Sequence, residues 1–167
     1  GSDDGAAAAT TNDPATAGSG ITLSETEGKV FNIYAWNEEF KGFFEKYYTV
    51  PEGVTVNWTI NPSDGGVYQQ KLDEALSGQD AAAADDKIDI FLVEADYALK
   101  YVDDECTMAV KDLGITDADL ADQYKYTKDI VTDSEGVLKG VSWQGCPGVL
   151  FYNREACKDI WGTDEPA

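Results

Sequence analysis

The chain has 167 residues and carries 32 Asp and Glu against 12 Lys and Arg, a formal net charge of −20 at pH 7. This length suffices for one domain that buries about 70% of the surface its unfolded form exposes. A surface this acidic repels nucleic acid and anionic lipid, so we exclude both as partners.

The chain contains no His and only three Cys, none with CxxC spacing. The usual zinc sites and His-based triads then lack a ligand or a base, so we predict no metal and no cofactor. The cysteines are either buried thiols or, outside the cytoplasm, one disulfide plus one thiol. For the disulfide we favour the pair Cys106 and Cys146, because the alternative, Cys146 and Cys157, would link a loop to the middle of a helix. No stretch is long and apolar enough to predict a membrane span or a signal sequence.

Residues 1–27 are predicted to form a disordered, low-complexity tether. Residues 1–20 are almost entirely Gly, Ala, Ser, Thr, Asp and Pro, which bury too little apolar area to offset the entropy of ordering. Such a tract is a spacer that holds a domain away from a surface, or a ragged terminus. It also matches the tract that comes after the lipidated cysteine of an exported bacterial lipoprotein.

The next elements alternate between strand and helix patterns. Residues 29–36 form an apolar run of strand length, and five aromatic residues then recur at helical spacing over residues 40–48. Residues 54–60 alternate apolar and polar side chains, which predicts a strand with one buried face.

A second helix and a third strand come after the turn-rich segment 61–66. Apolar residues at helical spacing mark a helix that begins near Tyr68 and ends at Ser77 and Gly78. Residues 88–93 are nearly all apolar, which predicts a central strand covered on both faces. Strands separated by helices predict an α/β fold with a mostly parallel sheet and helices on both faces. Further on, residues 133–136 predict a hairpin turn.

Ligands of open α/β sheets bind beyond the carboxyl ends of the strands, so the residues just after each strand are the candidate site. Eight such residues are predicted to contact the ligand: Trp36, Asn37, Glu38, Asp64, Glu94, Asp96, Trp143 and Gln144. Carboxylates and amides bind hydroxyl groups, and aromatic rings cover the C–H faces of sugars, so this set favours a neutral, polyhydroxylated ligand. A phosphate would require a Gly-rich turn with Lys or Arg, which no strand end supplies.

Each candidate also has a purely structural interpretation. Trp36 suits core packing, Asn37 and Glu38 suit a helix cap, and Asp64 suits a turn. Glu94 and Asp96 could cap the helix near residues 97–102, or serve as the acid and base of a glycoside hydrolase. The hydrolase is disfavoured, because neighbours two residues apart need not flank a bond at the required separation of about 5 to 9 Å.

A family resemblance is carried by four segments in order: KVFNIYAWNEEFKGFFEKYY, YQQKLDEALSG, DKIDIFLVEADYALKYV and LKGVSWQGCPGVLFYNREACKDIWGTDEPA. They resemble the extracellular solute-binding proteins of carbohydrate ABC transporters, family 1, which have a periplasmic-binding-protein-like type II fold. The resemblance implies two α/β lobes that close over a carbohydrate, with ABC permease subunits as partners and no enzymatic activity. It also implies export, as a lipoprotein on the cell surface or, in Gram-negative bacteria, in the periplasm.

The resemblance implies where the lobes divide. Residues 28–147 correspond to the N-terminal α/β lobe, whose last strand contains LKGVSWQ, and residues 148–167 to a crossover strand and helix that lead into an absent second lobe. Family members are commonly more than twice this long, so we expect the apolar residues near Val149–Phe151 and Ile160–Trp161 to be exposed and the chain to self-associate. Alternative functions are a receptor for a peptide, amino acid or polyamine, a glycoside hydrolase, or an adhesion module.

Overall fold

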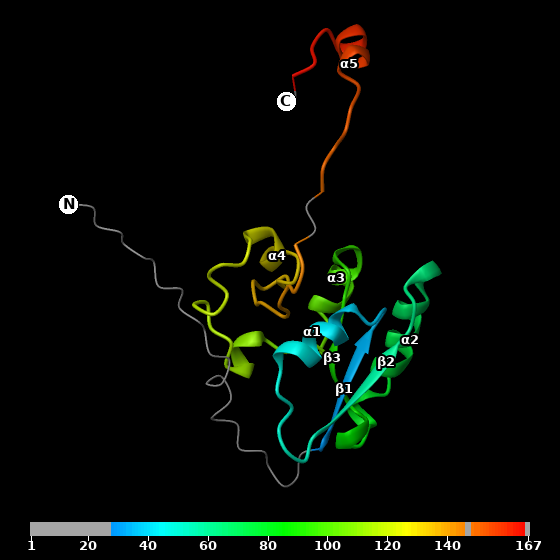
Figure 1. The fold of residues 1–167 in the computed structure, drawn as a ribbon, viewed down its shortest axis with the longest axis vertical. Coiled ribbons are helices and arrows are strands. Elements are labelled where there is room, and N and C mark those ends of the chain that lie inside the picture. Colours follow the sequence, from blue (N-terminus) through cyan, green and yellow to red (C-terminus); the bar gives the residue numbers. More distant parts are fainter. Residues whose placement is uncertain (1–27, 146–147, 166–167) are drawn as a thin grey trace, which may run out of the picture. The chain divides into compact units, whose positions relative to one another are not determined.

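The computed structural model describes residues 28–145 and 148–165, so the predicted tether and Cys146 lie outside the described residues. The chain divides into two units, with the boundary between Glu94 and Ala95. Figure 1 shows the elements of each unit along the chain.

The first unit contains a parallel sheet of three strands: β1 (Val30–Ala35), β2 (Thr55–Ile60) and β3 (Ile88–Phe91). The strand order is β2-β1-β3, and both neighbouring pairs are parallel. The three strands lie within the three segments for which the sequence predicts them. The prediction of an α/β fold with a parallel sheet is therefore confirmed.

Two helices connect these strands, α1 (Glu39–Tyr47) and α2 (Val67–Leu76), the second preceded by a short 3-10 turn (Asp64–Gly66). Phe31 of β1 stacks on Phe44 of α1, with ring centroids 6.3 Å apart. Trp36, just after β1, meets Tyr68 of α2 edge-on at 5.7 Å. Because alternate residues of a strand point to opposite faces, α1 and α2 cover opposite faces of the sheet.

The position of β3 corrects a prediction. Its apolar run was expected to form the central strand, but among the described residues β3 pairs with β1 alone, and Ile90 is 37% exposed. β1 is central instead, and its Ile33 and Ala35 are completely buried. The chain crosses β1 on its way from β2 to β3, and an apolar run does not reveal which strand will be flanked on both sides.

A buried amide holds the beginning of the sheet together. Asn32 donates from Nδ2 to the carbonyl oxygens of Asp85 and Lys87, at 2.7 and 2.8 Å, and accepts from Asn57 Nδ2 at 2.9 Å. The β1–β3 register shifts just after Asn32, whose backbone N–H donates to Asp89 Oδ2 at 2.8 Å. Polar side chains thus satisfy backbone groups that the irregular pairing leaves without strand partners.

The second unit contains three helices among its described residues: α3 (Ala95–Val102), α4 (Lys125–Asp129) and α5 (Arg154–Trp161), with a 3-10 turn at Val110–Leu113. The predicted turn at residues 133–136 is confirmed, because Thr132 and Leu138 form an antiparallel bridge across it and Gly136 has a φ of 82°. The prediction of a strand over residues 138–144 is wrong: apart from this single bridge, these residues form no strand. The described residues offer it no longer partner to pair with.

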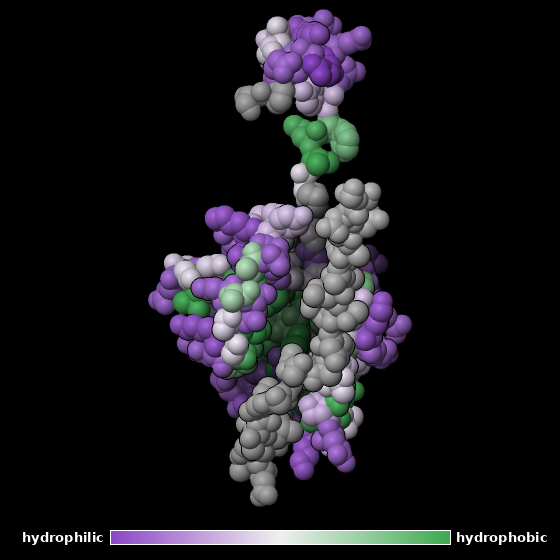
Figure 2. Space-filling model, turned by 60° about the vertical axis from the view of Figure 1, so that its left-hand side comes forward, coloured by the Kyte–Doolittle hydropathy of each residue, from purple (hydrophilic) through white to green (hydrophobic). Residues whose placement is uncertain are grey.

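The apolar run before α5 is extended and exposed. Leu150 and Phe151 are 86% and 89% exposed, and residues 148–153 form no strand, so the predicted crossover strand is absent here while its helix is present. Figure 2 shows the hydrophobic atoms of this run next to the hydrophilic α5. Asn153 caps α5 by accepting from the Ala156 backbone N–H at 3.1 Å.

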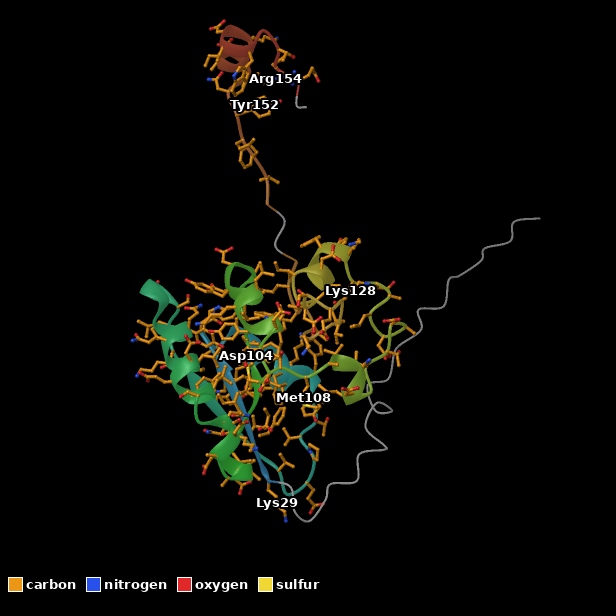
Figure 3. The ribbon with its side chains drawn as sticks, turned by 180° about the vertical axis from the view of Figure 1, so that it is seen from behind. Lys29, Asp104, Met108, Lys128, Tyr152 and Arg154 are labelled. Atoms are coloured by element: carbon orange, nitrogen blue, oxygen red, sulfur yellow. The ribbon has the colours of Figure 1, made fainter. Side chains whose placement is uncertain are left out.

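Local ion pairs hold α5 to the residues just beyond it. Arg154 Nε lies 2.6 Å from Asp164 Oδ2, and Lys158 Nζ lies 3.2 Å from the same oxygen. The Tyr152 hydroxyl donates to the Asp164 carbonyl oxygen at 2.9 Å, and Figure 3 marks Tyr152 and Arg154 where the helix begins. These contacts stabilise α5 and the turn that comes after it locally, over residues 152–165.

Candidate functional site

Five of the eight predicted ligand residues lie after strands of the first unit, at the carboxyl edge of its sheet. Trp36, Asn37 and Glu38 come directly after β1, Asp64 begins the turn beyond β2, and Glu94 lies beyond β3. Backbone hydrogen bonds continue past the strand ends, from Asn61 N–H to the Ala35 carbonyl and from Leu92 N–H to the Tyr34 carbonyl. The parallel pairing therefore places these segments at one edge, as predicted.

Tyr68 of α2 stabilises the carboxyl edge of the sheet through hydrogen bonds. Its hydroxyl donates to the carbonyl oxygens of Tyr34, near the end of β1, and Leu92, just after β3. Its ring is buried and meets Trp36 at an interplanar angle of 82°. Trp36 is half-buried, so core packing occupies one part of the indole and another part is open to solvent.

Glu94 is positioned by Gln69, a residue that sequence reasoning missed. Gln69 Nε2 donates to Glu94 Oε2 at 3.5 Å. Gln69 Oε1 is buried and has no hydrogen-bond partner among the described residues. Gln69 is only 5% exposed although it is polar. The sequence did contain one signal that Gln69 is buried: it lies next to Tyr68 and three residues before Leu72, on the buried face of α2.

The remaining predicted carboxylates and amide are either exposed or located at the beginning of a helix. Asn37 Oδ1 accepts from the Glu39 backbone N–H at 2.9 Å, in a turn just before α1. The N-cap residue of α1 is Glu38, whose side chain makes no capping hydrogen bond. Glu38 and Asp64 are exposed. Asp96 lies in the first turn of α3, in the second unit, where a carboxylate stabilises the positive helix end.

Trp143 and Gln144 lie together in the second unit. They line a hollow of about 210 Å³, which we call the Trp143 hollow, formed by Gln123, Tyr124, Thr127, Ser142, Trp143, Gln144 and Gly145. Sequence reasoning missed the contributions of Gln123, Tyr124 and Thr127. They lie about 20 residues before Trp143 in a polar segment with no strong periodicity, so no local pattern marked them.

Hydrogen bonds fix the walls of the Trp143 hollow. Gln123 Nε2 donates to the Ser142 carbonyl at 2.9 Å, and Ser142 Oγ donates to the Gln144 carbonyl at 2.6 Å. Thr127 Oγ1 donates to the Tyr124 carbonyl at 2.7 Å. Two segments distant in sequence are therefore held in one arrangement before any ligand binds.

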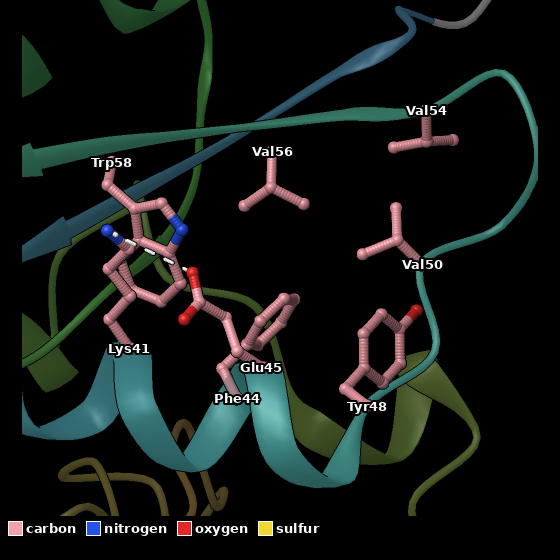
Figure 4. A pocket seen from close by; sticks show the side chains of 8 residues that line it. All are labelled: Lys41, Phe44, Glu45, Tyr48, Val50, Val54, Val56 and Trp58. Atoms are coloured by element: carbon pink, nitrogen blue, oxygen red, sulfur yellow. Dashed lines mark ion pairs between the residues drawn. The ribbon is translucent and has the colours of Figure 1, made fainter.

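A larger hollow of about 550 Å³ lies in the first unit (Figure 4). It is lined by Lys41, Phe44, Glu45, Tyr48, Val50, Val54, Val56 and Trp58. These residues come from α1, β2 and the loop between them. None of the eight predicted ligand residues lines it, and its Lys41 and Glu45 pair across one helical turn at 3.9 Å.

Cys106 is a half-buried thiol that does not favour ionisation. Burial and the neighbouring Asp104 carboxylate raise the pKa of the Cys106 thiol to about 12. Its predicted partner Cys146 lies outside the described residues, so the disulfide stays a prediction. Cys157 is buried in the segment that contains α5.

Comparison with known proteins found no matching family model, no matching curated protein and no matching solved structure. No helix within the described ranges is long and apolar enough to cross a membrane. Residues 28–145 and 148–165 also contain no group of three or more His, Cys, Asp or Glu side chains that could hold a metal ion.

Proposed function

We propose that this chain is the first lobe of a two-lobe, type II solute-binding receptor that captures a carbohydrate, of oligosaccharide class, and delivers it to an ABC importer. The observation that carries the proposal is the carboxyl edge of the parallel sheet, where Trp36, Glu38, Asp64 and Glu94 come after three different strands. This edge is where open α/β sheets bind ligands.

The chemistry of that edge favours a neutral polyol. A carboxylate accepts hydrogen bonds from two hydroxyl groups at once, and the Gln69 amide orients the Glu94 carboxylate before binding. The half-buried Trp36 offers an aromatic surface for the C–H face of a sugar ring. Binding then requires no covalent step, and the ligand is released chemically unchanged.

The cellular role is inferred from the resemblance and from composition. The receptor is exported and held on the bacterial surface by a lipid anchor, or resides in the periplasm, with residues 1–27 as its tether. Its partners are the carbohydrate and the membrane permease subunits of the importer. The net charge of −20 keeps such a tethered protein away from anionic lipid headgroups.

One observation favours a second candidate, a polyamine receptor on the same scaffold. With 32 acidic residues the chain attracts polycations, and Glu38, Asp64 and Glu94 lie at the predicted edge. Polyamine binding would depend on charge pairs and would weaken as salt screens them. Peptides and amino acids are further candidates for this scaffold, and a glycoside hydrolase is the least favoured.

The test is a titration of the chain with mono- and oligosaccharides, using amino acids and spermidine as controls. Saturation-transfer NMR detects weak binding, near 1 mM, where calorimetry requires tighter complexes. We expect one saccharide class to bind at both low and high salt and to be recovered intact. A response to spermidine alone, lost in salt, would transfer the function to the polyamine candidate, and shortened saccharides would indicate a hydrolase.

Variants at the sheet edge locate the binding. Glu94→Gln keeps the shape of the side chain but removes its charge, and we expect at least a tenfold loss of saccharide affinity, since hydrogen bonds to charged groups contribute about 1.5–3 kcal/mol. Glu52→Gln, an exposed glutamate in the loop before β2, is the matched control and should bind as the wild type does. Circular dichroism checks that both variants fold. Equal affinity in all three chains would contradict the assignment of Glu94.

A further inference from the structure

We propose that the Trp143 hollow is a subsite for a single saccharide ring, with Tyr124 as a stacking wall and Gln123 as a positioning residue. This inference rests on the proposed function and adds residues that the sequence did not indicate. The hollow lies entirely within the second unit, and its walls are held by contacts within that unit.

The lining of the hollow carries no charge. It consists of two Gln, one Tyr, one Thr, one Ser, one Trp and one Gly, and includes no Asp, Glu, Lys, Arg or His side chain. The chain as a whole has 44 charged residues among 167, the sum of 32 and 12. A lining of amides, hydroxyls and aromatic rings binds neutral hydroxyl groups and offers no counter-charge to a polyamine or to the two charged groups of an amino acid.

An exposed tyrosine pair supplies the stacking wall. Tyr124 is 69% exposed, yet its ring is stacked on that of Tyr126, with centroids 5.8 Å apart and planes inclined by 14°. The Thr127 hydroxyl holds the Tyr124 carbonyl. Stacking on Tyr126 orients the ring in advance, so less conformational entropy is lost when a ligand packs against it. Tyr and Trp supply large contact areas of this kind at low entropic cost.

Gly145 fits closely against the tyrosine pair. A Cβ atom at residue 145 would lie 3.3 Å from the Tyr126 hydroxyl oxygen and 4.0 Å from Tyr124 Cε2. The Tyr126 hydroxyl therefore approaches this part of the backbone closely, and a Cβ atom at residue 145 would displace it by a few tenths of an ångström, while Tyr124 would be in ordinary van der Waals contact. The loop that contains Trp143 therefore packs closely against the segment that contains Tyr124.

Size limits the ligand. The hollow of about 210 Å³ is smaller than the roughly 300–1,000 Å³ typical of pockets for drug-sized ligands. It accommodates one ring rather than a chain of several. We therefore assign it to a single saccharide ring.

The experiment compares three tyrosine variants against the saccharide that the wild-type chain binds. Tyr124→Ala removes the wall and should lower affinity by at least about tenfold, whereas Tyr124→Phe keeps the aromatic ring and should stay within about threefold. Tyr47→Ala, at a 67% exposed tyrosine of α1 in the first unit, is the control and should bind as the wild type does. Gly145→Ala should also weaken binding, because its Cβ atom displaces the Tyr126 hydroxyl and with it the ring on which Tyr124 is stacked.

The outcomes separate the subsite from the receptor function. Saccharide binding that is equally strong in the wild type, Tyr124→Ala and Gly145→Ala overturns the subsite and leaves the receptor function standing. Failure of every saccharide to bind the wild type overturns both. Circular dichroism of the variants shows whether the fold is intact, and a loss of affinity in Tyr124→Ala that Tyr124→Phe shares equally would overturn the stacking role.

Discussion

Cys106 is held as a neutral thiol by its surroundings. The Asp104 side chain accepts a hydrogen bond from the Cys106 backbone N–H at 2.9 Å, which keeps a negative charge close to the sulfur. With burial, this charge raises the pKa of the Cys106 thiol from 9.0 to about 12. Because the thiolate is the reactive form, the folded chain protects this residue from alkylation.

We expect iodoacetamide to modify Cys106 slowly in the reduced, folded chain at pH 8. The rise in pKa from 9.0 to about 12 lowers the thiolate population about a thousandfold. Mass spectrometry of the peptide containing Cys106 measures the rate, and the same chain in urea is the control. Asp104→Asn removes the charge but leaves the fold, so it should speed the reaction. Equal rates in the folded, unfolded and Asp104→Asn chains would refute this account.

The pKa of Cys106 also predicts how stability depends on pH. A thiol whose folded pKa is raised favours the protonated, folded chain, so its contribution is complete below the unfolded value near 9. As pH rises from about 9 towards 12, the unfolded chain releases this proton more readily, and the contribution is lost. Tyr and Lys titrate in the same range, so Cys106→Ser in parallel isolates the effect of this thiol.

At the scale of secondary structure, α2 joins two strands through one hydroxyl group. Tyr68 is almost completely buried, and its hydroxyl group donates to the carbonyl oxygen of Tyr34 in β1 and to that of Leu92 just after β3. Leu72, one turn later and completely buried, packs on the same side of the helix. This arrangement fixes the edge where Trp36 and Glu94 lie.

We expect Tyr68→Phe to lower the free energy of unfolding by about 1–2 kcal/mol. The ring keeps its packing, while the Leu92 and Tyr34 carbonyls lose a donor in a buried setting. Urea denaturation followed by circular dichroism measures the change. Tyr47→Phe, at an exposed tyrosine of α1, is the matched control and should change stability by less than about 0.5 kcal/mol. Indistinguishable midpoints for the two variants would show that the hydroxyl is not structural.

At the scale of the whole molecule, two features have opposite effects on self-association: the negative charge repels other copies of the chain, and the exposed apolar surface attracts them. The net charge of −20 keeps copies of the chain apart. Five large apolar residues are at least 70% exposed in one segment: Val149, Leu150, Phe151, Ile160 and Trp161. Apolar surface of this kind promotes association once the charges are screened.

We expect the chain to self-associate as salt is raised from about 0.01 to 1 M, where the Debye length falls from about 30 to about 3 Å. Light scattering at fixed protein concentration measures the mass. The double substitution Leu150→Ser and Phe151→Ser should keep the chain monomeric at high salt, while Tyr47→Ser serves as the control for loss of an exposed ring. A wild-type monomer at every salt concentration would rule out association through this segment.

The local pattern of side chains alone determined several elements of this protein. The aromatic spacing of residues 40–48, the alternation in residues 54–60 and the turn at residues 133–136 all predicted the observed structure. These features arise from backbone geometry within one segment, which repeats every 3.6 residues in a helix and every two in a strand. The same reasoning identified the carboxyl edge of the sheet and the residues just beyond its strands.

Only the tertiary structure decided which segments are neighbours. It placed β3 at the side of the sheet, left residues 138–144 and 148–153 without strands, and set Gln69 against Glu94. It also brought Tyr124 to the hollow that contains Trp143. Such contacts depend on the path of the connections and on burial summed over the whole chain. No single segment records them, because its own pattern is the same whichever neighbour it meets.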